Sequence, residues 1–216
     1  MRVGLKTHVL ENNRTQAAML REKFGEQTLV INMTGSPGAG KTSILEKLIP
    51  MLKDEFTIAV IEGDVQTSRD AERIVAMGIQ AIQINTMGGC HLDAKMIANC
   101  MGDLDGLPDI LFIENIGNLV CPAEYDLGED FKMTVLSIPE GEDKPLKYPG
   151  MFRNSRAVVM NKVDLLPHMP YNLEQVEDEI RGIQPDIHIF QIGSDPHTAA
   201  DLADWIRGEL KKKRSV

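Results

Sequence analysis

The densest group of chemically capable residues lies at positions 35–43, which read G-S-P-G-A-G-K-T-S. Gly35 is followed, after four residues, by Gly40, Lys41 and Thr42, which is the spacing of a phosphate-binding P-loop. Glycines let backbone N–H groups converge on an anion, Lys41 can bring a charge to the β- and γ-phosphates, and the Thr42 hydroxyl can ligate Mg²⁺. We predict that a nucleoside triphosphate binds to this loop, through Gly35, Gly38, Ala39, Gly40, Lys41, Thr42 and Ser43.

Two acidic residues follow apolar runs that are typical of buried strands. Asp64 comes shortly after residues 56–61, and Glu114 comes directly after residues 109–113. A carboxylate at the C-terminal end of a parallel strand, beside a phosphate site, holds Mg²⁺ or a hydrolytic water. Gly117, three residues after Glu114, completes a Walker B and switch II pattern in which the glycine N–H touches the γ-phosphate. The predicted catalytic residues are Lys41, Asp64 and Glu114, and the predicted Mg²⁺ ligands are Thr42, Asp64 and Glu114.

A third motif, Asn161-Lys162-Val163-Asp164, follows the apolar run at 156–160. In this N-K-x-D element the aspartate accepts hydrogen bonds from the guanine N1–H and exocyclic amino group, a pairing that adenine does not offer. The lysine stem covers the face of the base. We therefore predict GTP rather than ATP as the nucleotide, bound by Asn161, Lys162 and Asp164, with backbone contacts from residues 193–194.

Cysteine and histidine are placed where they could bind a second, softer metal. Cys90 and His91 are adjacent in a segment after the apolar run at 79–84, and Cys121 lies four residues after Gly117. Thiolates and imidazole are ligands for borderline metals such as Zn²⁺ and Ni²⁺. Because both segments follow strands of one parallel sheet, we predict a shared metal site formed by Cys90, His91 and Cys121.

Four of the candidate residues also have a structural interpretation. Asp64 would cap a helix that begins near Ser68, and Cys121 would be a buried cysteine at a turn. Cys100 is expected in the core, and His8 on the surface of a helix, so neither is assigned to a metal.

Short apolar runs alternate with helical patterns along the whole chain. This order predicts an α/β fold: a mostly parallel P-loop NTPase sheet with helices on both faces, in a single domain. We place an N-terminal helix within residues 1–27 and the P-loop GTPase domain over residues 28–216. Residues 140–149, with two prolines and several charges, are expected to form an exposed loop.

Composition excludes several classes of protein. The 216 residues are 43% hydrophobic and 25% charged, which is typical of a globular chain. A net charge of -9 argues against non-specific binding to nucleic acid. No apolar stretch approaches the roughly 20 residues that cross a bilayer, and no signal peptide is recognisable. The odd number of cysteines, three, is typical of a reducing compartment, so we expect a cytoplasmic protein without membrane or nucleic-acid partners.

Four segments together resemble the HypB family, the SIMIBI-class P-loop GTPases that insert nickel into [NiFe]-hydrogenase. They are I-E-N-I-G-N-L-V-C-P-A at 113–123, G-C-H-L-D-A at 89–94, G-S-P-G-A-G-K-T at 35–42 and G-E-D-K-P-L-K-Y-P at 141–149. The resemblance extends over roughly residues 6–210. The Cys-Pro-His motif of the sibling urease-maturation GTPases is absent.

The resemblance implies a low-turnover regulatory GTPase whose nucleotide state controls homodimerisation and metal transfer. It implies that Cys90, His91 and Cys121 bind Ni²⁺ or Zn²⁺ across the dimer interface, and that GTP or GDP binds with Mg²⁺. The implied partners are a HypA-type nickel chaperone and the hydrogenase large subunit. The cysteine-rich and histidine-rich nickel motifs of some members are missing, and the segment at 193–197, G-S-D-P-H, departs from the family pattern for the base.

Three rival functions remain open. A GTPase that matures another metalloenzyme, such as urease, would share all the nucleotide motifs. A P-loop metabolic kinase would need an acceptor-binding lid and would lack N-K-x-D. A nickel-storage protein is disfavoured because the chain has only five histidines.

Overall fold

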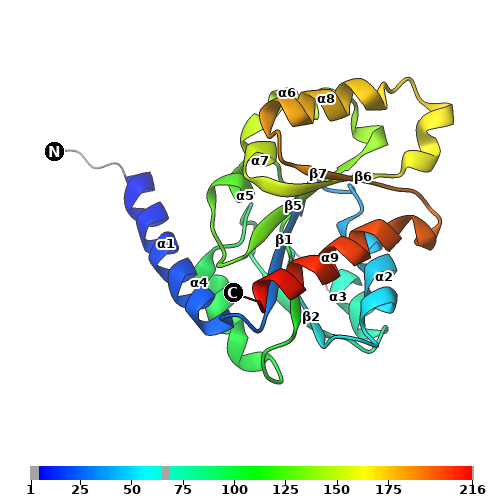
Figure 1. Ribbon diagram of the computed structural model, residues 1–216. Coiled ribbons are helices and arrows are strands. Elements are labelled where there is room, and N and C mark those ends of the chain that lie inside the picture. The colour runs from blue at the N-terminus through cyan, green and yellow to red at the C-terminus, as the bar shows by residue number, and fades with distance from the viewer. Residues whose placement is uncertain (1–4, 65–68, 216) are drawn as a thin grey trace.

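The computed structural model describes residues 5–64 and 69–215, and its centre is a seven-stranded sheet (Figure 1). The strands lie side by side in the order β3-β2-β4-β1-β5-β6-β7, and within the described ranges every neighbouring pair is parallel. In chain order they are β1 Leu29–Gly35, β2 Ile58–Asp64, β3 Gln80–Asn85, β4 Ile110–Glu114, β5 Phe131–Ser137, β6 Ser155–Asn161 and β7 His188–Ile192. The predicted single-domain α/β fold is confirmed, with a sheet that is wholly rather than mostly parallel in this part of the chain.

Helices cover both faces of the sheet (Figure 1). They are α1 Leu5–Phe24, α2 Lys41–Leu52, α3 Arg69–Val75, α4 Ala94–Cys100, α5 Cys121–Glu124, α6 Lys144–Lys147, α7 Pro149–Arg153, α8 Leu173–Ile183 and α9 Ala200–Lys213. α2, α3 and α9 pack on one face, whereas α1, α4, α7 and α8 pack on the other. No helix in the described ranges is both long and apolar enough to cross a membrane.

One face of the sheet carries a continuous apolar core. Alternate residues of a strand point to opposite faces, and on this side β1 contributes Ile31 and Met33. α2 and α9 pack Leu48 and Ile206 against them, and all four side chains are fully buried. This core fixes where β1 ends, and therefore where the loop at 36–40 begins.

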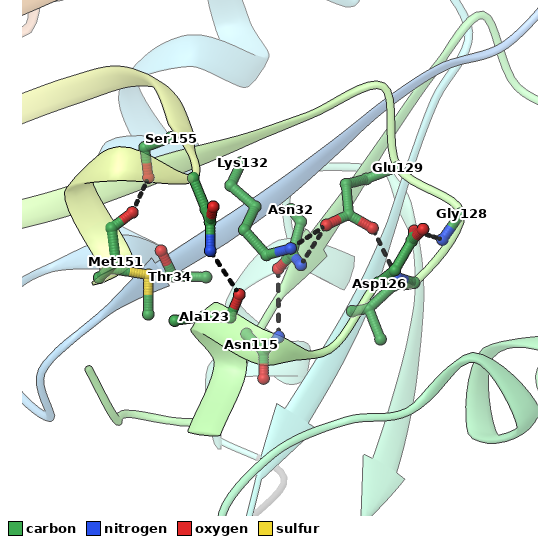
Figure 2. A network of polar contacts seen from close by, with 12 residues as sticks. Asn32, Thr34, Asn115, Ala123, Asp126, Gly128, Glu129, Lys132, Met151 and Ser155 are labelled. Atoms are coloured by element: carbon green, nitrogen blue, oxygen red, sulfur yellow. Dashed lines mark hydrogen bonds and ion pairs between the residues drawn. The ribbon is translucent and has the colours of Figure 1, made fainter. Parts of the chain in front are cut away.

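The opposite face is divided by a polar seam, which we define as Asn32, Thr34, Lys132 and Thr134. Figure 2 labels the first three of these residues. Asn32 is paired in register with Lys132, and Thr34 with Thr134, whose hydroxyls lie 2.9 Å apart. The ammonium of Lys132 is buried with the carboxylate of Glu129 at 2.7 Å. The seam separates the apolar cluster under α1 and α4 from the cluster under α7 and α8.

Two boundaries differ from the sequence-based expectation. β2 continues to Asp64 instead of ending near residue 61, because Glu62 and Gly63 keep pairing with β3. The exposed loop expected at 140–149 is wrong from residue 144 onward, because Lys144–Lys147 and Pro149–Arg153 form the short helices α6 and α7, each with a proline in its first turn. The helix start near Ser68, which Asp64 was expected to cap, lies outside the described residues.

Candidate functional site

The loop between β1 and α2 has the backbone of a phosphate-binding turn. Gly40 has a φ of 95°, in the left-handed region that favours glycine. A Cβ at this position would also collide with the side-chain amide of Asn161, so both conformation and space require glycine. α2 begins at the next residue, and the first N–H groups of a helix favour an anion in front of them.

Two buried carboxyl groups lie side by side behind this loop. Glu62 of β2 is opposite Glu114 of β4 in the parallel register, and the two residues are 3% and 6% exposed. Glu114 Oε1 accepts a hydrogen bond from Thr42 Oγ1 at 2.9 Å. Burial, reinforced by Glu114, raises the pKa of Glu62 to about 8. Burial raises the pKa of Glu114 to about 7 against the opposing charge of Lys41, whose own pKa is lowered by burial.

The oxygen atoms of this group fit a hard divalent cation. Glu62 Oε2 and Glu114 Oε2 are buried and have no hydrogen-bond partner among the described residues. Together with the Thr42 hydroxyl they form the all-oxygen donor set that Mg²⁺ requires. The residues present are therefore compatible with Mg²⁺ beside the phosphate loop.

A cavity of about 450 Å³ opens over these groups. This volume is in the range of small-molecule sites, about 300–1,000 Å³. The cavity is lined by residues from every predicted nucleotide motif. These residues are Lys41, Thr42, Asp64, Glu114, Gly117 and Lys162.

The N-K-x-D element is held against the phosphate loop. Asn161 Nδ2 donates to the carbonyl of Ala39 at 2.8 Å, and Lys162 Nζ donates to the carbonyl of Gly38 at 2.7 Å. Asp164 Oδ1 accepts from the backbone N–H of Ser194 at 2.9 Å. Residues 193–194 thus lie next to Asp164, as expected for a segment that approaches the base.

Cys90, His91 and Cys121 come together at the same edge of the sheet. The Sγ atoms of Cys90 and Cys121 are 3.1 Å apart, and Cys90 Sγ is 3.5 Å from His91 Nδ1. The three ligand atoms lie within 4.8 Å of one another, and all three side chains are at least partly exposed. Two thiols and one imidazole suit Zn²⁺ or Ni²⁺. Burial lowers the pKa of His91, against the opposing charge of Asp93, which favours the neutral imidazole that ligates metals.

Residues 117–121 connect the phosphate loop to Cys90, His91 and Cys121, which we call the metal group. Gly117 packs so closely on Pro37 that a Cβ would lie 2.8 Å from the proline Cα. Asn118 donates its backbone N–H to the carbonyl of Gly35 at 2.9 Å and its side-chain amide to the carbonyl of Cys90 at 3.0 Å. Cys121 follows three residues later. A displacement of residues 117–121 at the phosphate loop would therefore change the positions of both Cys90 and Cys121.

The family model for the CobW/HypB/UreG nucleotide-binding domain matches residues 29–191. HypB of Escherichia coli K12 is 51% identical over 189 residues, which cover 86% of this chain and 65% of that protein. The chain belongs to the HypB family. Hydrogenase/urease maturation factor HypB of Helicobacter hepaticus is 42% identical, with 94% of this chain and 86% of that protein covered. The crystal structure of HypB from Helicobacter pylori in complex with nickel has a TM-score of 0.88 and 39% identity, and covers 94% of this chain and 97% of that one.

Sequence reasoning missed one acidic residue of this HypB-family site. Glu62 is not among the predicted Mg²⁺ ligands, although it lies two residues from Asp64 and therefore points to the same side of β2. Only the pairing of β2 with β4 places Glu62 beside Glu114. Cys100 lies in the core, as expected, and its thiol donates a hydrogen bond to the carbonyl of Ile97. His8 lies on the exposed surface of α1, as expected, near Glu11.

Proposed function

We propose that this chain is a GTP-hydrolysing metallochaperone that delivers nickel during [NiFe]-hydrogenase maturation, with its GTP state coupled to dimerisation and metal binding. The observation that carries the proposal is the segment at 117–121, which contacts the phosphate loop and bonds to Cys90 before it reaches Cys121. The names of the relatives support the same role, because the E. coli protein is called a hydrogenase maturation factor.

The nucleotide chemistry is assigned to the residues around the cavity. Lys41 and the glycines of the loop hold the phosphates, Gly117 contacts the γ-phosphate through its N–H, and Asp64 orients the hydrolytic water. Thr42, Asp64 and Glu114, with Glu62 added to this set, would hold Mg²⁺, and the ion would supply positive charge beside the nucleotide phosphates. Asp164 selects guanine, with Asn161 and Lys162 beside it. Positioning and charge stabilisation are sufficient for a slow, regulatory turnover.

The metal step follows from the position of Cys121. When the γ-phosphate orders residues 117–121, Cys121 and Cys90 are held together with His91, and a second copy of the chain brings its own three ligands to the same ion. Hydrolysis relaxes the segment and lowers the affinity for the metal, which passes to the acceptor. GTP and metal thus favour the homodimer together, and the partners are a HypA-type nickel chaperone and the hydrogenase large subunit. In this scheme residues 1–27 are an N-terminal addition to the GTPase domain at 28–216, in a cytoplasmic protein.

The test is to measure the mass of the protein in solution with GDP, with a non-hydrolysable GTP analogue and with Ni²⁺, each alone and in combination. The proposal expects the dimer to be favoured most by the GTP analogue and Ni²⁺ together. A titration of the metal-free protein complements it, and binding weaker than about 10 µM, roughly 7 kcal/mol, would favour a GTPase without a metal function.

A urease-type target is a second candidate, favoured by the name of the H. hepaticus relative. Hydrogenase and urease activities in a strain that lacks this gene separate the two targets, since only the dependent enzyme loses activity and regains it with added nickel.

A further inference from the structure

Asn115, the first residue after β4, is almost fully buried (1% exposed) and uses both ends of its side-chain amide. Its Oδ1 accepts hydrogen bonds from the backbone N–H groups of Leu92 at 3.3 Å and Ile116 at 2.9 Å. Its Nδ2 donates to Asn32 Oδ1 at 3.1 Å. Two backbone donors require an oxygen on one side of the amide, and Asn32 offers an acceptor on the other, so these contacts fix one orientation.

The contacts of Asn115 extend to both groups of the site. Leu92 is the neighbour of His91 and lies two residues from Cys90. On the other side, Asn115 is the neighbour of Glu114, and its own backbone N–H bonds to the carbonyl of Met33 at 2.9 Å. A single buried side chain therefore holds the segment with two metal ligands against the start of the phosphate-contacting segment.

The support behind Asn115 is rigid. Asn32 lies in the central strand β1 and donates its own amide to Glu129 Oε1 at 3.2 Å, within the network around Lys132 that Figure 2 shows. A buried, fully bonded network keeps one arrangement because each lost bond leaves an unsatisfied polar group. On the other side of the Asn115 amide, one oxygen accepts from Leu92 and from Ile116, so it joins the segment with Cys90 and His91 to the start of the segment that contacts the phosphate loop.

We propose that Asn115 is a positioning residue through which the nucleotide state sets the geometry of the metal ligands Cys90 and His91. The inference rests on the proposed function and deepens it, because the coupling then reaches all three ligands rather than Cys121 alone. Outer-sphere residues that orient metal ligands typically change metal affinity about 10–100-fold when removed. Asn115 differs from an ordinary residue of this kind because its contribution depends on which nucleotide is bound.

Asn13 of α1 provides the matched control. It is also a buried asparagine (7% exposed), and its Oδ1 accepts from the backbone N–H of Ala94 at 2.8 Å, two residues after Leu92. Its Nδ2 donates to the carbonyl of Asp126, away from the phosphate loop. Asn13 therefore holds the same metal-bearing segment from a helix that is not in the lining of the nucleotide cavity.

The experiment compares the dissociation constant of Ni²⁺ in the presence of Mg²⁺ with GDP and with a non-hydrolysable GTP analogue. Allosteric couplings are typically about 5–150-fold, and we expect a ratio of that size for the unmodified chain. Asn115→Ala should reduce the ratio to less than about twofold. Asn13→Ala should weaken Ni²⁺ binding by a similar factor with both nucleotides, about tenfold, and leave the ratio unchanged.

Three results would overturn the inference. If Asn115→Ala keeps the full ratio, Asn115 does not transmit the nucleotide state, even if absolute affinity falls. If Asn13→Ala abolishes the ratio as well, the effect is loosening of the segment and not transmission. A ratio near one in the unmodified chain refutes the proposed coupling itself, which is a different failure. Should the alanine variant not fold, Asn115→Ser keeps a buried hydroxyl but is too short for Leu92, and the same expectation applies.

Discussion

The nucleotide cavity and the metal group lie at the same edge of the sheet but are built in opposite ways. In the nucleotide cavity Lys41, Thr42, Glu62 and Glu114 are buried on strand ends and on the first turn of a helix. In the metal group Cys90 is exposed and His91 and Cys121 are half-buried, in segments between strands. A buried set of charges binds strongly and changes little, whereas partly exposed ligands outside the sheet can accept and release an ion. In the proposed function this contrast corresponds to two tasks, with the cavity sensing the nucleotide and the metal group exchanging the ion.

The largest effect is expected from Lys41→Ala, which should impair the nucleotide cavity and leave the metal group intact. Removal of one partner from a buried charged contact costs about 2–5 kcal/mol, so we expect nucleotide affinity to fall at least 30-fold. Ni²⁺ affinity without nucleotide should stay within twofold, because Lys41 is not part of the metal group. Calorimetric titration measures both quantities, with Lys23→Ala on the exposed surface of α1 as the control. An equal loss of metal binding would show that the two sites are not separable.

The second prediction concerns the base. Asp164→Asn should weaken GTP binding by about 1.5–3 kcal/mol, because hydrogen bonds to a charged acceptor are lost. Xanthosine triphosphate, which has a carbonyl where guanine has an amino group, should gain affinity. Asn keeps the acceptor for Ser194, so the neighbouring loop stays in place. Competition binding with both nucleotides measures the change, and unchanged selectivity would remove Asp164 from the base site.

The third prediction tests the exposed side of the contrast. Cys121→Ala should lower Ni²⁺ affinity at least about tenfold, the smallest effect expected of a group close to a metal. It should also reduce the response of Ni²⁺ affinity to GTP, because the segment that begins at Gly117 then no longer ends in a metal ligand. Cys100→Ser is the matched control, because this thiol is buried in the core and lies outside the metal group. Unchanged affinity and an unchanged GTP response in the Cys121 variant would separate the metal site from the nucleotide switch.

The fourth prediction, with the smallest expected effect, concerns the pH dependence of stability that the buried carboxyl groups of the nucleotide cavity cause. With pKa values of about 8 for Glu62 and about 7 for Glu114, against a usual value of 4.5, the folded protein binds more protons than the unfolded chain between these values. Stability without nucleotide or divalent cation should therefore fall as pH rises from about 5 to about 8. Glu62→Gln cannot ionise and should lose less stability, by about 1 kcal/mol, since one pKa unit corresponds to about 1.4 kcal/mol. Denaturant unfolding at pH 7 and pH 8 measures this difference, and an equal loss of stability in the two proteins would contradict it.

Local sequence was sufficient for the groups that are encoded in consecutive residues. Gly35 to Thr42 specify strand, turn and helix together, and N-K-x-D follows its strand directly, so their positions could be predicted. Glu62 could not, because its importance comes from the pairing of β2 with β4. The amides of Asn13 and Asn115 could not either, since they bond to residues that are 81 and 23 positions away. The loop expected at 140–149 also differs from the structure, because the prolines of α6 and α7 begin helices instead of excluding them.

The polar seam has a consequence for folding fidelity. Because strand side chains alternate, a slip of β5 by one position against β1 would move Lys132 to the apolar face under α2 and α9, away from Glu129. A buried charge that loses its partner costs about 3–5 kcal/mol, a large part of the stability of an ordinary domain. An unbroken apolar face would tolerate such a slip far better. Lys132 therefore penalises misaligned sheets before any nucleotide binds, and the correct alignment is the one that places Asn32 behind the metal-bearing segment.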